Sequence, residues 1–172
     1  MPATAPRLSR AGFGRPAAPI RILHLGLGNF VRAHLAWYTE HAPDAADWGI
    51  AAFTGRSAAA AEALAPQDGL YTLVTRAPGG DEFEVVSALS AVHPAADHAA
   101  WLAYWRSPRL AIVSLTITEG GYLRRADGGL DLDLRAVAAD VAALRADPEA
   151  AVATAPARLV AGTLARRAAG GG

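Results

Sequence analysis

Two closely spaced glycines, Gly26 and Gly28, mark the stretch most able to support chemistry. The run before them, Ile20 to Leu25, is apolar and predicts a buried β-strand. Glycine permits a tight turn because it has no Cβ, and Asn29 is a good helix N-cap. A strand, a glycine turn and a helix N-terminus present backbone N–H groups and the positive end of the helix dipole to an anion. The stretch therefore indicates a place for the pyrophosphate of a dinucleotide.

The dinucleotide fingerprint Gly-x-Gly-x-x-Gly/Ala is incomplete in this stretch. Gly26 and Gly28 fill its first two positions, but Val31 stands at the third, and Ala33 comes two residues late. The glycines alone leave open both a nucleotide site and an ordinary glycine-rich turn between a strand and a helix.

Two arginines are candidate contacts for such a cofactor. A Rossmann site usually has an acidic residue after its second strand, but this chain has Thr54-Gly55-Arg56-Ser57 there. Arg56 could meet a 2′-phosphate or stack on adenine, which would favour NADP, or it could be a solvated loop residue. Arg32 could contact the pyrophosphate or a substrate hydroxyl, or form a surface ion pair. The choice between NAD and NADP stays open.

Polar residues also gather at the end of a later strand, predicted over Leu110 to Thr118 as an interior strand of the sheet. Thr116, Thr118 and Glu119 stand at its carboxyl end, where ligands bind in open α/β sheets. The threonine hydroxyls could reach the nicotinamide ribose, and the carboxylate could relay a proton. The alternative is a strand end that is simply solvated by polar residues.

Composition excludes several classes of function. The net charge is zero, which gives no indication of nucleic acid or of an anionic membrane as partner. Cysteine and lysine are absent, so thiolate chemistry and a lysine base are impossible within this polypeptide. We expect no metal site, because cysteine and a His-Glu-x-x-His pattern are both missing. His24 is expected to be a hydrogen-bonded strand residue, not a ligand.

The remaining elements predict an α/β fold with a mainly parallel, doubly wound sheet covered on both faces. Residues 1–19 lack a signal-peptide pattern and are expected to form a disordered leader, with an organellar transit peptide as the alternative. We expect a single domain over 20–172 and a protein in the cytoplasm. The strands are expected at 20–25, 49–54 and 110–118, with a hairpin insertion formed by 70–76 and 82–88. The helices are expected at 29–41, 57–64 capped by Ser57, 97–104 capped by Asp97, 134–146, and 154–167 capped by Thr154.

Three linked motifs resemble the long-chain polyol dehydrogenases, the family of mannitol dehydrogenase and fructuronate reductase. They are the Gly-x-Gly-Asn-Phe-x-Arg-Ala-His stretch, Gln67 to Leu73, and Leu115 to Tyr122. The resemblance implies a Rossmann fold, NAD or NADP as cofactor, and hydride transfer between nicotinamide and a secondary alcohol of a polyol or sugar acid. It implies Glu119 as a catalytic proton-relay or gating group, and a cofactor site formed by Gly26, Leu27, Gly28, Asn29, Phe30, Arg32, Arg56, Thr116 and Thr118.

The family's lysine base and asparagine segment have no counterpart among these 172 residues. We therefore expect the chain to be the cofactor-binding half of such an enzyme, inactive alone unless another polypeptide supplies the substrate domain. Two alternatives remain: a non-catalytic nucleotide-binding or interaction module, and a vestigial fragment.

Overall fold

The computed structural model describes residues 7–170, which fall into two compact units. The first unit contains the residues up to Ala95 together with Ala111–Thr116, and the second contains Ala96–Leu110 and the residues from Ile117 onward. The domain expected over residues 20–172 is thus distributed over both units. No helix among residues 7–170 is long and apolar enough to cross a membrane.

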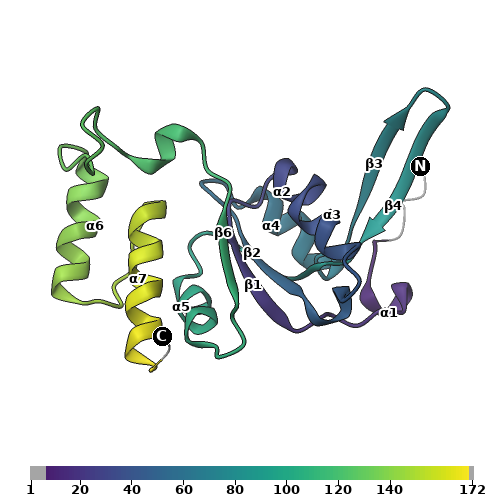
Figure 1. Cartoon of the computed structure of the whole chain (residues 1–172), viewed down its shortest axis with the longest axis horizontal. Helices are drawn as coiled ribbons and strands as arrows, with labels where there is room; N and C mark the ends of the chain where they lie inside the picture. The colour runs from purple at the N-terminus through teal and green to yellow at the C-terminus, as the bar shows by residue number, and fades with distance from the viewer. Residues whose placement is uncertain (1–6, 171–172) are drawn as a thin grey trace, which may run out of the picture. The chain divides into compact units, whose positions relative to one another are not determined.

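The first unit is built on a four-stranded sheet in which every recorded pairing is parallel (Figure 1). Its spatial order is β5-β2-β1-β6, so the chain enters in the middle of the sheet. The strands are β1 (Ile20–Leu25), β2 (Gly49–Phe53), β5 (Leu89–His93) and β6 (Ile112–Leu115). The α/β class and the parallel sheet predicted from the sequence are confirmed.

Two details of the sheet differ from the prediction. β6 pairs only with β1 among the described strands and forms an edge, so its expected interior position is wrong. Its first residue, Ile112, is 44% exposed, as one open side of the strand allows. β5, which pairs with β2 at the opposite edge, was not predicted at all. Only Ser87 and Ala88 separate β5 from the hairpin. Because neither is a glycine or a proline, the sequence carries no turn signal that would predict a separate strand.

The helices of the first unit are α2 (Asn29–Ala33), α3 (Leu35–Glu40) and α4 (Ala59–Leu64), with the 3-10 turns η1 (Ala45–Asp47) and η2 (Ala65–Gln67). The continuous helix expected over 29–41 is wrong, because His34 leaves helical geometry at φ −120° and ψ −86°. Two predicted caps are also wrong. Gly28 is the N-cap of α2, which makes Asn29 its first helical residue, and Ala58 is the N-cap of α4, although Ser57 accepts a hydrogen bond from the Ala59 amide.

The core of this unit lies between the sheet and these helices. Val31, Ile50 and Leu89 have no exposed surface, and Leu27 and Leu64 are nearly as deeply buried. These side chains join α2, α4, β2 and β5 in one apolar cluster. Burial of apolar area is the main stabilising contribution to folding, so this cluster also fixes the loop that leaves β1.

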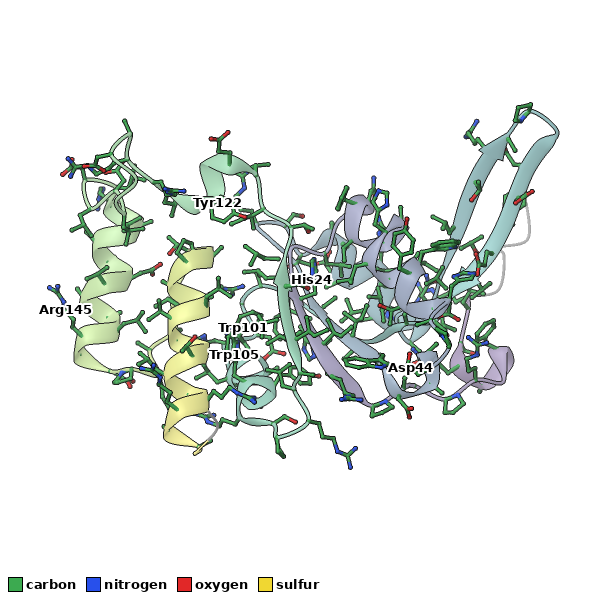
Figure 2. The ribbon with its side chains drawn as sticks, viewed as in Figure 1. His24, Asp44, Trp101, Trp105, Tyr122 and Arg145 are labelled. Carbon is green, nitrogen blue, oxygen red and sulfur yellow. The ribbon has the colours of Figure 1, made fainter. Side chains whose placement is uncertain are left out.

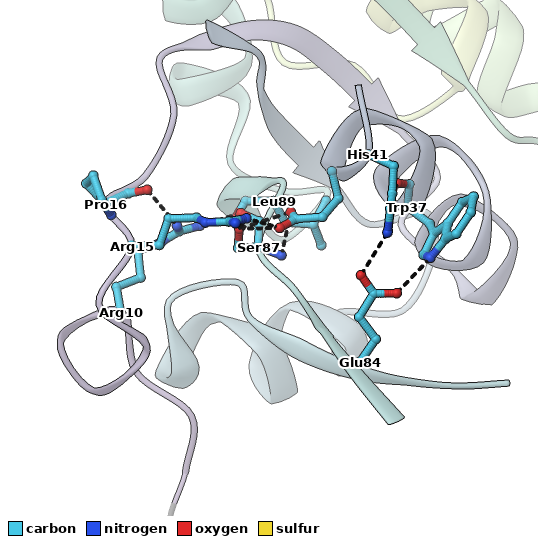
Figure 3. A network of polar contacts seen from close by, with 9 residues as sticks. Arg10, Arg15, Pro16, Trp37, His41, Glu84, Ser87 and Leu89 are labelled. Carbon is cyan, nitrogen blue, oxygen red and sulfur yellow. Dashed lines mark hydrogen bonds and ion pairs between the residues drawn. The ribbon is translucent and has the colours of Figure 1, made fainter. Parts of the chain in front are cut away.

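An antiparallel hairpin follows η2, as the sequence predicts. It consists of β3 (Tyr71–Ala77) and β4 (Gly80–Val86), with Tyr71 paired to Val86. The Glu84 carboxylate joins β4 to α3 by accepting from Trp37 Nε1 at 2.9 Å and contacting His41 Nε2 at 3.0 Å (Figure 3). The hairpin is therefore attached to the helix layer near its base.

Part of the segment expected as a leader has definite contacts. Residues 10–13 form α1 (Arg10–Phe13), and the Arg10 guanidinium donates to the carbonyls of Ser87 and Leu89 at 2.8 and 2.9 Å (Figure 3). Arg15 forms an ion pair with the largely buried Glu40, which also accepts from the Ser87 amide. These contacts tie residues 10–15 to the connection between the hairpin and β5. Residues 1–6 lie outside the described part.

The second unit is helical: α5 (His98–Arg106), η3 (Glu119–Tyr122), α6 (Arg135–Ala146) and α7 (Ala155–Ala168). The predicted caps of Asp97 on α5 and Thr154 on α7 are confirmed by hydrogen bonds from Ala100 N and Ala157 N. Trp101 lies on α5 (Figure 2) and donates from Nε1 to the Arg158 carbonyl of α7. Asp140 of α6 accepts from the amides of residues 153 and 154, which fixes the start of α7.

Candidate cofactor site

The turn after β1 requires glycine at its first position. Gly26 has φ +112°, a value that side-chain-bearing residues rarely adopt. A Cβ there would also overlap the carbonyl oxygen of Thr116 and lie 2.8 Å from its Oγ1. Gly28 is different: its φ is −134°, and a Cβ would meet only the Gly26 oxygen at 3.7 Å. The first glycine is therefore required by the fold, and the second leaves open space beside the backbone.

The turn uses its backbone amides in two ways. The amides of Gly26 and Leu27 both donate to the Phe53 carbonyl at 2.9 Å, and the Leu27 side chain is buried in the core. Across residues 7–170, nothing accepts a hydrogen bond from the amides of Gly28, Asn29 and Phe30. Gly26 and Leu27 thus hold the turn on β2, and the next three residues have donors available for a ligand.

The helix after the turn is short. α2 has five residues, so its dipole adds little to the free N–H groups. The Phe30 ring is 64% exposed and lies 4.3 Å from the His34 ring between centroids. The capacity of this site to hold an anion therefore rests on the amides themselves and on nearby cationic groups.

Arg32 supplies one such cation beside the turn. Its Nε donates to the Gly28 carbonyl at 3.2 Å, and a terminal nitrogen donates to the Asn29 side chain. Its guanidinium carbon lies 5.9 Å from the centre of the Tyr71 ring, and the Tyr71 hydroxyl donates to the Arg32 carbonyl. No carboxylate in the described residues pairs with Arg32, so its charge is held next to the three free amides.

Arg56 lies exposed just after β2. Thr54, at the strand end itself, is buried and its Oγ1 accepts from the Ala95 amide at 2.9 Å. The Thr54 hydroxyl is therefore engaged within the protein. Of the two, Arg56 is the residue whose side chain is available to solvent or a ligand.

The Thr116 side chain contacts the glycine turn and His24, a role that the sequence did not indicate. Its Oγ1 donates to the Gly26 carbonyl at 2.8 Å and lies 3.1 Å from His24 Nε2. The hydroxyl expected to reach a ribose thus holds the turn. His24, on β1 (Figure 2), is fully buried, and its Nδ1 lies 2.9 Å from Ser114 Oγ. Burial lowers the pKa of His24 to about 4, an effect that the nearby Gly26 backbone partly opposes.

Sequence reasoning classified His24 as a hydrogen-bonded strand residue, and this is confirmed. It did not connect His24 with the turn, because Thr116 lies 92 residues further along the chain. Parallel pairing of β1 with β6 is the signal that brings them together, since it places His24 opposite Ser114.

Thr118 and Glu119 belong to the second unit. Thr118 is the N-cap residue of η3 without a side-chain capping bond, and Glu119 is the first residue of that turn. Both are exposed. In the part of the chain that the structure describes, no three His, Asp or Glu side chains are grouped so that they could hold a metal ion.

Comparison with known proteins identifies the family. A family model described as the mannitol dehydrogenase Rossmann domain matches residues 20–171. Mannitol 2-dehydrogenase of Cereibacter sphaeroides is 38% identical over 141 residues, covering 78% of this chain and 30% of the relative. Polyol:NADP oxidoreductase of Gluconobacter oxydans is 45% identical over 129 residues, covering 70% of this chain and 26% of the relative.

A solved structure agrees with these matches. Substrate-free D-sorbitol dehydrogenase is similar with a TM-score of 0.78 and 36% identity, covering 96% of this chain and 37% of that one. The chain therefore spans only about a third of the length of the proteins that it resembles. Its sheet, its glycine turn and these matches together show that the chain belongs to the mannitol dehydrogenase family, as the Rossmann cofactor-binding part of the polyol dehydrogenases.

Proposed function

We propose that this chain binds a nicotinamide dinucleotide, with the pyrophosphate on the amides of Gly28, Asn29 and Phe30 and with Arg32 beside it. The observation that carries the proposal is the division of the turn: two amides are fixed to Phe53, and the following three have no acceptor within residues 7–170. Free N–H groups after a glycine turn favour an anion. The Arg32 guanidinium, which forms no ion pair with a carboxylate within residues 7–170, adds charge of the right sign.

The form of the coenzyme depends on Arg56 in this proposal. Arg56 is exposed beyond β2, and no carboxylate occupies the end of that strand to favour the free ribose hydroxyls of NAD. The name of the relative polyol:NADP oxidoreductase includes NADP, whereas the name mannitol 2-dehydrogenase includes no coenzyme. Where NADP binds, we expect Arg56 to contact the 2′-phosphate, so Arg56→Ala should weaken NADPH binding and spare NADH binding.

The reaction that the bound coenzyme would serve is hydride transfer between nicotinamide and a secondary alcohol of a polyol or sugar acid. Relatives are named for mannitol, arabinitol and mannonate. Glu119 is the proposed proton-relay group of this chain. Arginine remains protonated at neutral pH, and the chain has no lysine, so it cannot supply the lysine base that the family resemblance implies for taking the alcohol proton. We expect these 172 residues alone to give no turnover, because general base catalysis commonly contributes a factor of about 10² or more.

Calorimetric titration with NADH and NADPH tests the binding proposal. The wild-type chain should bind at least one of them, and Gly28→Val should abolish binding. The φ of Gly28 suits a side-chain-bearing residue, and a Cβ there would meet only the Gly26 oxygen, at an ordinary contact distance of 3.7 Å. Loss of binding with an unchanged melting temperature would therefore place the ligand at this residue. A folded wild-type chain that binds neither coenzyme would overturn the proposal and leave an interaction module or a vestigial fragment.

The activity proposal has a separate assay. The purified chain is incubated with mannitol and oxidised coenzyme, or with fructose or fructuronate and reduced coenzyme, and absorbance at the nicotinamide band is followed. We expect no turnover. Robust turnover would contradict the incomplete site, whatever the binding result.

A further inference from the structure

We propose that His24, as the neutral Nε2–H tautomer, is a positioning residue that orients Thr116 and through it the glycine turn. This inference rests on the proposed coenzyme site, because the turn is where that site begins. A continuous path of hydrogen bonds runs from Ser114 through His24 and Thr116 to the carbonyl of Gly26.

The direction of every bond in this path follows from its last acceptor. The Gly26 carbonyl can only accept, so the single proton of the Thr116 hydroxyl must point toward it, over 2.8 Å. The Thr116 oxygen must then accept from His24 Nε2, which lies 3.1 Å away. A neutral imidazole has one N–H, so Nδ1 carries none and accepts from the Ser114 hydroxyl at 2.9 Å. In the opposite tautomer Nε2 carries no proton and would accept from the Thr116 hydroxyl. The Gly26 carbonyl would then lose its hydrogen bond from Thr116.

The path reaches the backbone where the turn is most constrained. Gly26 has a positive φ, and its own amide and the next one are both bonded to Phe53 on β2. Its carbonyl is bonded to Thr116, just beyond β6. Hydrogen bonds therefore hold the turn from both sides of β1, to Phe53 on the β2 side and to Thr116 on the β6 side. On the β6 side, His24 orients the Thr116 hydroxyl that donates to the Gly26 carbonyl.

His24 has no exposed surface, so it cannot touch a coenzyme itself. Any effect of His24 on coenzyme binding must pass through its neighbours. This separates the proposal from a simple packing role, which would depend on side-chain volume and not on a donor at the Nε2 position. His24→Gln and His24→Leu make the comparison, because both fill similar space and only Gln can donate to Thr116 Oγ1.

The first experiment measures the tautomer in the wild-type chain without coenzyme, from the ¹⁵N shifts of the His24 ring at pH 7. We expect a protonated Nε2 and an unprotonated Nδ1. A protonated Nδ1 in the neutral ring would overturn the proposal outright. This test needs no variant, so it holds even if a substitution in the core prevents folding.

The second experiment measures hydrogen exchange at the amides of Gly26 and Leu27, whose bonds to Phe53 report whether the turn is held. His24→Leu and Thr116→Val should speed exchange there by about tenfold, the effect of losing one hydrogen bond. His24→Gln and Thr116→Ser keep the donor and the hydroxyl and should stay near the wild-type rate. Equal exchange in His24→Leu and His24→Gln would overturn the proposal.

Coenzyme titration of the same proteins links the path to the site. Weaker binding by His24→Leu, restored in His24→Gln, supports a positioning role. If His24→Leu binds as tightly as the wild type, the positioning role is refuted. If the wild-type chain binds no coenzyme, the proposed function fails, and the tautomer and exchange results still decide whether His24 orients the turn.

Discussion

Gly162 of α7 lies directly against the indole of Trp105 in α5. A Cβ at this position would overlap three atoms of the ring, among them the indole nitrogen. Trp105 is itself buried, so it has little space to move away. α5 and α7 therefore pack at a distance that only glycine permits at position 162. Glycine usually destabilises a helix, but here the contact between the two helices requires it.

Gly162→Ala should destabilise the second unit. Overpacking by one methyl group commonly costs about 1–3 kcal/mol, and this exceeds the gain in helix propensity from alanine. The measurement is the free energy of unfolding in urea. Gly120→Ala is the matched control, because nothing lies within 4 Å of a Cβ at that position. A Gly162→Ala protein as stable as the control would show that the two helices separate easily.

Gly26→Ala should both weaken the fold and abolish coenzyme binding. Its positive φ is unfavourable for alanine, and the added Cβ would overlap the Thr116 backbone. Strain of this kind costs about 1–3 kcal/mol. Circular dichroism on heating and the calorimetric titration measure the two effects. Gly28→Ala gives the comparison: it should unfold at the wild-type temperature, so equal melting of both variants would argue against a strained turn.

Acid should destabilise the protein through His24. The pKa of this side chain is lowered from 6.5 to about 4 by burial, so between these values the unfolded chain binds more protons than the folded one. Stability contributed by the neutral ring is complete above pH 6.5 and is lost as pH falls toward 4, by about 3 kcal/mol for a single group.

Urea unfolding at a series of pH values from 7 to 4 measures this contribution. His24→Gln removes the titrating group, so its stability should depend less steeply on pH over the same range. Parallel pH dependences for the two proteins would mean that His24 titrates alike in the folded and unfolded states.

Arg10→Met should loosen the N-terminal segment from the sheet. The guanidinium donates to the carbonyls of Ser87, Leu89 and Asp68, and a methionine of similar length can replace none of these bonds. The expected loss is about 1–3 kcal/mol, because bonds from a charged donor are involved. Proteolysis of the native protein should also reach residues 7–19 faster. Arg7→Met, an exposed position in the same segment, is the control and should change neither measurement.

Local chemistry made several parts of this fold predictable. The apolar run before Gly26 and the Pro-Gly-Gly-Asp turn of the hairpin each carry their own signal, and β1, β3 and β4 lie close to where these signals put them. The Asp97 and Thr154 caps are also local, since each side chain bonds an amide three residues ahead.

Other features depend on residues far apart in sequence. The apolar half of β6 suggested an interior strand, but the sheet order is decided by which strands pair, and β6 is an edge in the described residues. Asn29 has the composition of a cap, yet Gly28 occupies that position and Asn29 instead accepts from Arg32. The contacts of Arg10 span more than 70 residues to β5. No periodicity could indicate them.

The attachment of the glycine turn to β2 and to Thr116 has a consequence for the speed of recognition. Its backbone loses conformational freedom when the protein folds, so a dinucleotide need not order this loop on arrival. Association should then be governed by collision and orientation, with little delay for loop closure at this end of the ligand.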